Sequence, residues 1–448
     1  MMKLIDHHTP KPSRDFKSAI AYLFNLQKFG IKLGLANITD LLKYLGNPQK
    51  KLRCIHVAGT NGKGSTCAFL VSILKKSGCR TGLYISPHLI DFTERIRIND
   101  TQIPGERVIQ LTADIKRICE QHALHHITFF EFVTAMAFKY FEEEKADPVI
   151  VEVGMGGRYD ATNVIKPLVS IITSISLEHQ KYLGKTLSLI AGEKAGIIKK
   201  NAPVISGAHQ ARVHAIISQN CKIQGSPLYR LGADITYRKT GQGTFNYKGT
   251  TLQLSSLHAG LRGDHQIKNA SLAVAAAELL RNSNYCISSQ NIVDGISEAF
   301  WPGRIEVVRE QPTVILDGAH NPEGWRVLKA TLKKDFSYKR LILLLGIMED
   351  KNIQQMLKIL TPGAYAIIFC RPEMERAANK DLLEKFIRFS FRNRVFWIDT
   401  SKEALEKALS MAMRTDDLLC ITGSLFLVGE IRELMLNKKL SSPGRIGL

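Results

Sequence analysis

The sequence predicts an α/β protein with two domains, each built on a largely parallel sheet. Short apolar runs recur along the chain, and a loop and an amphipathic helix follow most of them, which is the pattern of buried parallel strands with crossover helices. The length of 448 residues exceeds what a single hydrophobic core usually holds. With 45% hydrophobic and 23% charged residues, the composition is typical of a globular protein and not of a disordered one.

The first domain is expected to span residues 1–300. Its first strand covers residues 53–58 and its first helix residues 65–77, where Gly78 favours a helix end. Further buried strands are expected at residues 81–86, 148–153 and 168–175. Residues 234–254 alternate around Gly-rich turns, which predicts a small antiparallel insertion, and an alanine-rich helix follows at 265–280.

The second domain is expected to span residues 301–448. The segment AFWPGR at 299–304 interrupts the pattern with a Pro-Gly turn, and a new strand–helix series begins after it. Strands are expected near residues 313–316, 340–346, 365–370, 395–398 and 418–422, each followed by a plausible helix. Five such units in succession predict a doubly wound, Rossmann-like domain.

The lengths of the apolar runs and the spacing of the cysteines argue against a membrane-spanning or exported protein. The longest apolar stretches, such as residues 341–345, are far shorter than the roughly 20 residues that a membrane span needs. The first 16 residues contain no apolar run of signal-peptide length. The eight cysteines include no CxxC pair, which is typical of a reducing compartment. We therefore expect a cytoplasmic protein.

The chain is basic, with 61 Lys and Arg against 41 Asp and Glu and a formal charge of +20. Basic residues are in excess both before and after residue 300, so no basic tail or arm creates the charge. A diffuse positive field suits nucleic acid, and it equally suits small polyanions such as nucleotides and polycarboxylates. Composition alone leaves both kinds of ligand open.

The strongest local signal is GTNGKGST at residues 59–66, between the first strand and the first helix. Glycines let backbone N–H groups approach a phosphate chain, Lys63 can reach its terminal oxygens, and the hydroxyl of Ser65 or Thr66 can bind Mg²⁺. The motif departs from the regular P-loop, since Val57 stands where the first glycine would be and Gly64 follows the lysine. The candidate nucleotide-binding residues here are Thr60, Asn61, Gly62, Lys63, Gly64, Ser65 and Thr66.

This loop resembles the nucleotide loop of the Mur ligase superfamily, and later motifs resemble its folate branch, the dihydrofolate synthases and folylpolyglutamate synthases. The matching motifs follow in order over both domains: SPHL (86–89), FFE (129–131), EVGMGGR (152–158), DATN (160–163), HQKYLG (179–184), EKAG (193–196), HQ (265–266), NA (269–270), WPGR (301–304), DGAHNP (317–322), GS (423–424) and GE (429–430). A single motif could match this family by chance, whereas a set of this length in the same order is specific to it.

The resemblance implies an ATP-dependent amide ligase that adds L-glutamate to dihydropteroate and to reduced folates through an acyl phosphate. It implies an N-terminal P-loop ATPase-type domain that binds ATP (1–300), a C-terminal glutamate-ligase domain (301–448) and a monomer. Its partners would be small molecules, with no nucleic acid and no membrane. Both steps of the reaction gather negative charge on oxygen atoms, which metal ions and fixed cations stabilise.

The resemblance also implies residue roles. Ser65, Ser86, Glu152 and His179 would hold Mg²⁺; Glu152 ends the apolar run VIVEVG, at the edge where open α/β sheets bind ligands. Lys63, Lys194 and His320 would take part in catalysis, and Lys194 would carry a carbamate. Asn269 from the first domain and Arg304 and Asp317 from the second would contact the nucleotide, so ATP would lie between the domains. Phe130, Asp160 and Ala161 would contact the pterin, and residues 29–38 resemble the loop that closes over it.

Three other functions stay open. One is a folylpolyglutamate synthase without the dihydropteroate activity. A second is a Mur ligase acting on a UDP-muramoyl peptide, although the 58 residues before the loop are too few for the usual UDP-binding domain. The third, from another class, is a nucleic-acid-stimulated P-loop ATPase, which predicts a regular P-loop and a concentrated basic stripe. Three positions depart from many relatives: Ile85, where Thr is frequent, and Glu178 and Asn352, where Asp is common.

Overall fold

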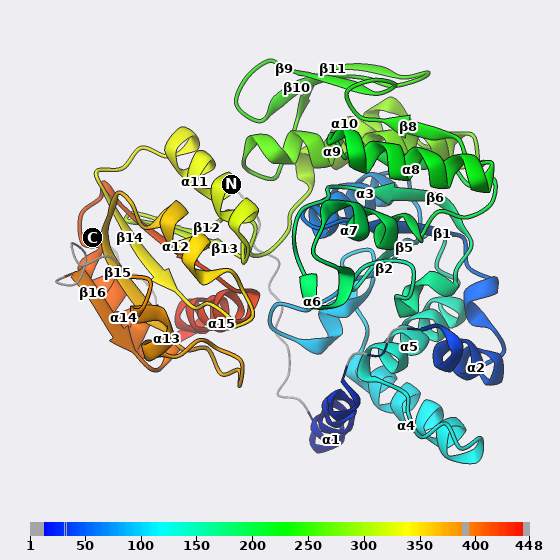
Figure 1. Ribbon diagram of the computed structural model, residues 1–448, viewed down its shortest axis with the longest axis horizontal. Coiled ribbons are helices and arrows are strands. Elements are labelled where there is room, and N and C mark those ends of the chain that lie inside the picture. Colours follow the sequence, from blue (N-terminus) through cyan, green and yellow to red (C-terminus); the bar gives the residue numbers. More distant parts are fainter. Residues whose placement is uncertain (1–12, 31, 33, 388–393, 442–448) are drawn as a thin grey trace.

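The computed structural model describes residues 13–30, 32, 34–387 and 394–441. The chain forms two α/β halves that lie side by side, the first on the right of Figure 1 and the second on the left. The prediction of no signal peptide concerns mainly residues 1–12, which are outside the described residues, as are Ile31 and Leu33 of the loop at 29–38. No helix among the described residues is both long enough and apolar enough to cross a bilayer.

The sheet of the first half has β1 near its centre. Within the described residues its strand order is β4-β3-β2-β5-β1-β6-β7-β8, and all neighbours are parallel except at β3 and β4. The strands are β1 (Cys54–Ala58), β2 (Gly82–Tyr84), β3 (Ile96–Ile98), β4 (Thr101–Gln102), β5 (Val149–Glu152), β6 (Pro167–Ile172), β7 (Val204–Ser206) and β8 (Leu228–Arg230). The predicted parallel sheet is confirmed, whereas its antiparallel edge β3-β4 and its parallel strands β7 and β8 were not expected.

Helices cover both faces of this sheet, and alternate residues of one strand enter different cores. Ile150 of β5 packs with α3 (Lys63–Lys76), α9 (Asp264–Arg281) and α10 (Ser289–Glu298), while Val149 and Val151 pack on the opposite face. That opposite core is formed with α1 (Arg14–Asn25), α2 (Ala36–Tyr44), α4 (Gly105–Gln121) and α5 (Phe129–Glu143). The remaining helices are α6 (Gln180–Leu183), α7 (Leu187–Ala195) and α8 (Ala211–Gln224). Burial on both faces explains why the strand segments are continuously apolar.

The predicted antiparallel insertion is a three-stranded sheet that covers α9 (Figure 1). It consists of β9 (Thr236–Lys239), β10 (Thr244–Lys248) and β11 (Gln253–His258), so it continues a few residues past the expected end. The buried Glu278 of α9 accepts hydrogen bonds from Tyr247 Oη (2.8 Å), Thr250 Oγ1 (3.0 Å) and the backbone N–H of Leu252 (3.0 Å). This carboxylate joins the insertion to the helix that also carries Asn269.

The second half contains the five predicted strand–helix units. Among the described residues its strand order is β12-β13-β17-β14-β15-β16, parallel except for β12. The strands are β12 (Glu306–Glu310), β13 (Thr313–Asp317), β14 (Arg340–Leu345), β15 (Ala364–Cys370), β16 (Val395–Ile398) and β17 (Asp417–Thr422); the helices are α11 (Pro322–Asp335), α12 (Ile353–Leu360), α13 (Lys380–Glu384), α14 (Ser401–Met411) and α15 (Leu425–Ser441). The antiparallel β12 was not expected, because its residues are half-exposed and carry no buried-strand pattern.

We predict that Glu278→Ala lowers the free energy of unfolding by about 3 kcal/mol, because it leaves several buried donors without an acceptor. Urea denaturation followed by circular dichroism measures the change. The matched control is Glu298→Ala on α10, which removes an exposed carboxylate paired with Lys76 and should cost less than about 1 kcal/mol. Equal losses in the two variants would contradict the anchoring role of Glu278.

Candidate active site

The loop at residues 59–66 turns tightly between β1 and α3. Gly59 has φ +152°, and a Cβ there would lie 1.9 Å from Thr173 Oγ1. Gly62 precedes the helix with φ +90°, in the left-handed region that favours glycine, and a Cβ there would lie 2.5 Å from Asn269 Oδ1. The two glycines therefore allow the backbone of the loop to pack directly against Thr173, which follows β6, and against Asn269 of α9. The turn leaves the first N–H groups of α3 at a helix N-terminus, where anions bind favourably.

Two lysines donate to the same backbone carbonyl in this turn. Lys63 Nζ lies 3.1 Å and Lys194 Nζ 2.8 Å from Gly59 O. Lys194 belongs to α7, yet it is only 4% exposed. Burial, together with the charge of Lys63, lowers the pKa of Lys194 to about 7. A large fraction of this amine is therefore uncharged at neutral pH.

Glu152 ends β5 and faces the same loop. Its Oε1 lies 4.0 Å from Lys63 Nζ, and the backbone N–H of Ser86 donates to its carboxylate. Because β2 and β5 are parallel neighbours, Ser86 and Glu152 emerge at the same sheet edge. Burial raises the pKa of Glu152, and the nearby charges of Lys63 and Arg304 act against that rise. A buried carboxylate of this kind is stabilised by added positive charge.

The predicted Mg²⁺ residues contribute few of the usual metal-binding side chains. No group of three or more His, Cys, Asp or Glu residues that could hold a metal ion is present in the part of the chain that the structure describes. Glu152 and Ser86 lie together, and Ser65 is buried in the first turn of α3. Carboxylate and hydroxyl oxygens are ligands that Mg²⁺ accepts, with water or phosphate oxygens completing its shell. These three residues fit such an ion.

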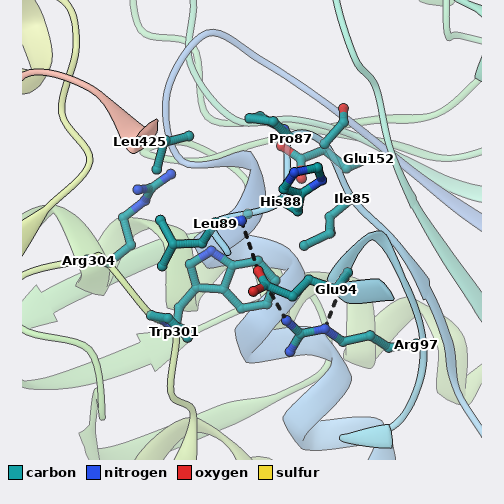
Figure 2. Close-up of a pocket in the computed structure, with 13 residues that line it drawn as sticks. Ile85, Pro87, His88, Leu89, Glu94, Arg97, Glu152, Trp301, Arg304 and Leu425 are labelled. Carbon is teal, nitrogen blue, oxygen red and sulfur yellow. Dashed lines mark hydrogen bonds and ion pairs between the residues drawn. The ribbon is translucent and has the colours of Figure 1, made fainter. Parts of the chain in front are cut away.

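A small cavity of about 50 Å³ lies where the two halves meet (Figure 2). Glu152 and Ser86 line it from the first half, and Arg304 and Leu425 line it from the second. Trp301, in the connection between the halves, also lines it, and its indole packs so closely on Gly64 that a Cβ there would lie 3.1 Å from Trp301 Nε1. Residues of the connection thus contact the nucleotide-loop motif directly.

A larger cavity of about 420 Å³ is shared by both halves. Six of the predicted residues line it: Ser86, Phe130, Asp160, Ala161, His179 and His320. Sequence reasoning did not single out Arg95, Lys351 and Arg376, which line it as well. Ser86 borders both cavities, so the two spaces meet at the residues around Glu152.

Phe130 and Asp160 form a fixed wall of the larger cavity. Phe130 stacks on Tyr84 with ring centres 6.1 Å apart, and Gly154 leaves room for its ring, since a Cβ there would lie 2.5 Å from Phe130 Cζ. Asp160 accepts hydrogen bonds from the backbone N–H groups of Met155 (2.8 Å) and Thr162 (3.0 Å). Burial raises the pKa of Asp160, and these donors partly offset the effect.

Polar contacts join the halves on the other side of the loop. Glu178 accepts from His320 Nε2 at 3.1 Å and from Asn321 Nδ2 at 3.3 Å, and Lys351 Nζ lies 3.8 Å from it. Burial alone would raise the pKa of Glu178, but the hydrogen bond and charge of His320 hold it well below its usual value. Sequence reasoning had noted Glu178 only as a departure from relatives. The structure makes it the main acceptor between the halves at this point.

The nucleotide-loop residue Asn61 also contacts the second half. Its Oδ1 accepts from Asn321 Nδ2 at 2.9 Å, and its own Nδ2 donates to Glu323 Oε2 at 3.3 Å. Asn321 caps α11 by accepting from the N–H of Gly324 at 2.8 Å. The start of α11 is therefore tied to the loop, which sequence reasoning did not foresee.

Asn269 and Asp317 line neither of the two cavities. Asn269 lies against Gly62 and donates to Gln266 Oε1 at 2.9 Å. Asp317, at the end of β13, is buried and accepts from the N–H groups of Ile305 (3.1 Å) and Ala319 (3.0 Å). Burial raises the pKa of Asp317, and the charge of Arg304 opposes the rise. In this structure Asp317 holds the backbone directly after Arg304 and directly before His320.

Comparison with known proteins gives matches over nearly the whole chain. Residues 57–277 match the Mur ligase middle domain, and residues 303–425 match the Mur ligase glutamate ligase domain. The dihydrofolate synthase/folylpolyglutamate synthase of Bacillus subtilis is 37% identical, over 93% of this chain and 98% of the relative.

Two solved structures are similar over the same extent. Folylpolyglutamate synthase from Thermotoga maritima is 34% identical with a TM-score of 0.81, covering 95% of this chain and 98% of that one. E. coli FolC in complex with DHPP and ADP is 33% identical with a TM-score of 0.85, covering 96% of this chain and 100% of that one.

We predict that Gly59→Ala destabilises the protein by about 2–4 kcal/mol, because the new methyl group overlaps Thr173 in a position that cannot relax easily. Thermal or urea unfolding measures the change. Gly192→Ala on α7 is the control: nothing lies within 4 Å of a Cβ there, so this helical substitution should stabilise by about 0.5–1 kcal/mol. A neutral Gly59→Ala variant would mean that the turn is looser than described.

Proposed function

This chain belongs to the folylpolyglutamate synthase and dihydrofolate synthase family of Mur ligases, and we propose that its two cavities together carry out ATP-dependent addition of L-glutamate to dihydropteroate and to reduced folates. The observation that carries the proposal is the position of Ser86 and Glu152: Glu152 lies 4.0 Å from Lys63 of the nucleotide-loop motif, and Ser86, which lines the small cavity with Glu152, also lines the 420 Å³ cavity with its aromatic and acidic wall. A phosphate donor on one side can thus meet a carboxylic acid on the other.

The reaction needs two transfers at this junction. A carboxylate oxygen of the acceptor attacks the terminal phosphorus of ATP, forming an acyl phosphate and releasing ADP. The amine of glutamate then attacks the acyl carbon, and the amide forms as phosphate leaves with its electron pair and the amine loses a proton. Both steps place negative charge on oxygens, so fixed positive groups accelerate them.

We propose a role in these steps for several of the chain's own residues. Lys63 and the first N–H groups of α3 bind phosphate oxygens, and Arg304 approaches from the second half. His320 lies at the border of the acceptor cavity, where it can orient the reacting groups. Mg²⁺, held by Ser65, Ser86, Glu152 and His179, would supply further positive charge to the phosphates. The contact between Asn61 and the start of α11 links this site to the second half.

The wall formed by Phe130, Asp160 and Ala161 supports a pterin as the bound portion of the acceptor. An aromatic ring stacks on a flat heterocycle, and a carboxylate accepts hydrogen bonds from an aminopyrimidine edge. Because Asp160 is already held by two backbone donors, its orientation is fixed before the acceptor binds. Dihydropteroate and reduced folates both carry a pterin, so one wall can serve both acceptors of the proposed bifunctional enzyme.

We assign residues 1–300 to the ATP-binding domain and residues 301–448 to the glutamate-ligase domain. Residues from each half line both cavities. The two domains are therefore separate folding units that share one active site. We further propose that the protein acts as a cytoplasmic monomer on small molecules alone, without nucleic acid or membrane.

The deciding measurement is phosphate release with MgATP and L-glutamate, using dihydropteroate, a reduced folate or no acceptor. We expect turnover with both acceptors and none without one. Turnover with the folate alone would support the narrower folylpolyglutamate synthase. Turnover with neither, or stimulation by DNA or RNA instead, would contradict the proposed acceptor.

Lys194 is proposed to carry a carbamate. A carbamate forms when an uncharged amine attacks CO₂, and the pKa of about 7 makes the uncharged amine available at neutral pH. The product is an anion that would bind the metal ion beside Glu152 and relieve the repulsion between Lys194 and Lys63.

We predict that Lys194→Ala loses more than about 99% of kcat, on the scale seen when one charged group at a reacting centre is removed, and that acetate or formate partly restores it. Lys199→Ala is the control, since this half-buried lysine donates to the carbonyl of Asn163 and is not among the residues proposed for the reaction. In CO₂-depleted buffer the activity of the unsubstituted enzyme should recover on adding bicarbonate, less readily as pH falls below about 7, where the amine is protonated. Full activity of Lys194→Ala would exclude the carbamate.

A further inference from the structure

Arg95 is a buried cation on the wall of the larger cavity. It ends the short 3-10 helix η3 (Phe92–Arg95), is 7% exposed, and borders the same space as Phe130 and Asp160. Its Nε donates to His88 Nδ1 at 2.8 Å, and its guanidinium carbon lies 5.2 Å from the centre of the Phe129 ring.

This guanidinium makes no direct ion pair among residues 13–30, 32, 34–387 and 394–441, and the charge of Glu94 acts on it only from a greater distance. No carboxylate there lies within 4 Å of it, and no hydrogen bond from these residues reaches Nη1 or Nη2. The adjacent Glu94 is directed elsewhere, accepting from the backbone N–H groups of Leu89 (2.9 Å) and Ile90 (3.0 Å). A buried charge without a partner is unfavourable, so this position favours an anionic ligand group.

The position of Arg95 relates it to the reacting end of the acceptor. Its backbone carbonyl accepts from the N–H of Ile85, the residue before Ser86, at 3.0 Å, and both Arg95 and Ser86 line the larger cavity. Since His88 holds Nε and Phe129 supports the guanidinium, the terminal nitrogens remain as a fixed pair of donors. Such a pair matches the two oxygens of a carboxylate.

We propose that Arg95 binds the glutamate carboxylate of a folate acceptor that is not converted to the acyl phosphate. Arg95 would thereby determine specificity for acceptors that carry glutamate. The proposal rests on the proposed function. A folate ends in glutamate, which has two carboxylates: one is converted to the acyl phosphate and the other stays ionised throughout. Dihydropteroate has a single carboxylate, which is the one that reacts. Arg95 is therefore needed for one acceptor and dispensable for the other.

The test is kcat/KM of Arg95→Met with each acceptor. For a reduced folate we expect a fall of about ten- to hundredfold, mostly through a higher KM, because the interaction is the same in the ground and transition states. For dihydropteroate we expect a change below about threefold, within the range of an indirect effect. Arg95→Lys should lie between, since lysine keeps the charge and loses the paired donors.

Two controls make the result specific. Arg117→Met on α4 removes an exposed cation, 64% exposed, and should leave both acceptors unaffected, which excludes a general effect of net charge. Folate analogues carrying an amide in place of one or the other glutamate carboxylate provide the second control. The analogue that still reacts carries the amide in place of the carboxylate that Arg95 is proposed to bind. With it the unsubstituted enzyme should be less active than with the reduced folate, and Arg95→Met should be nearly as active as the unsubstituted enzyme.

Other results overturn the inference. Equal losses with both acceptors would mean that Arg95 supports a part of the site common to both, and no loss with either would mean that it binds no substrate. If the unsubstituted enzyme uses neither acceptor, the proposed function itself fails. In that case the affinity for the reduced folate is measured by quenching of tryptophan fluorescence. Equal affinity of the unsubstituted protein and Arg95→Met would exclude Arg95 as a carboxylate-binding residue. A tenfold lower affinity of Arg95→Met would support it.

Discussion

The candidate site depends on one backbone carbonyl, that of Gly59, to which the ammonium groups of Lys63 and Lys194 both donate. Two like charges in a buried turn repel each other, and this repulsion contributes to the lowered pKa of Lys194. The arrangement is possible because Gly59 has no side chain and lies at the end of the central strand β1, where Thr173 packs against it. Glu152, 4.0 Å from Lys63 Nζ, balances part of this positive charge, and a bound anion or loss of the proton of Lys194 can balance the rest. A phosphate chain and a modified lysine are two ways of meeting the same electrostatic requirement.

The two halves meet through polar contacts more than through a continuous core. Glu178, Asn61 and Asn321 join them by hydrogen bonds, and each hydrophobic cluster belongs essentially to one half, apart from contributions such as Leu89. Contacts of this kind resemble those of transient interfaces, in which relative movement of domains is the usual expectation. We therefore expect the ligands that fill the two cavities to influence how the halves lie. Trp301 packs on Gly64 and under the guanidinium of Arg97. A ligand bound at the nucleotide-loop motif would therefore act directly on the connection between the halves.

Most of the fold could be predicted from the sequence because the information is local. Strands such as β5 are buried on both faces and so appear as unbroken apolar runs, and the residues at 59–66 are consecutive. The strands β3, β4, β7, β8 and β12 were missed, since the first four have two or three residues each and β12 is half-exposed, and their pairing depends on neighbours. The missed contacts are those between distant segments: Asn61 and Glu323 are 262 positions apart. Arg95 gave no signal, because an arginine is usually exposed and only the folded chain buries this one without a counter-ion.

The position of β17 has a consequence for how the protein is made. β17, the last strand of the described chain, is wholly buried and lies between β13 and β14 in the middle of its sheet. While the ribosome has released only the residues before 417, β13 and β14 have no strand between them, and each presents an unpaired edge to the cell. The first sheet, by contrast, has all its strands by residue 230. Translation thus yields a complete first sheet well before the second can close, and during that interval the nascent second half is the segment most exposed to wrong pairing and most in need of chaperones.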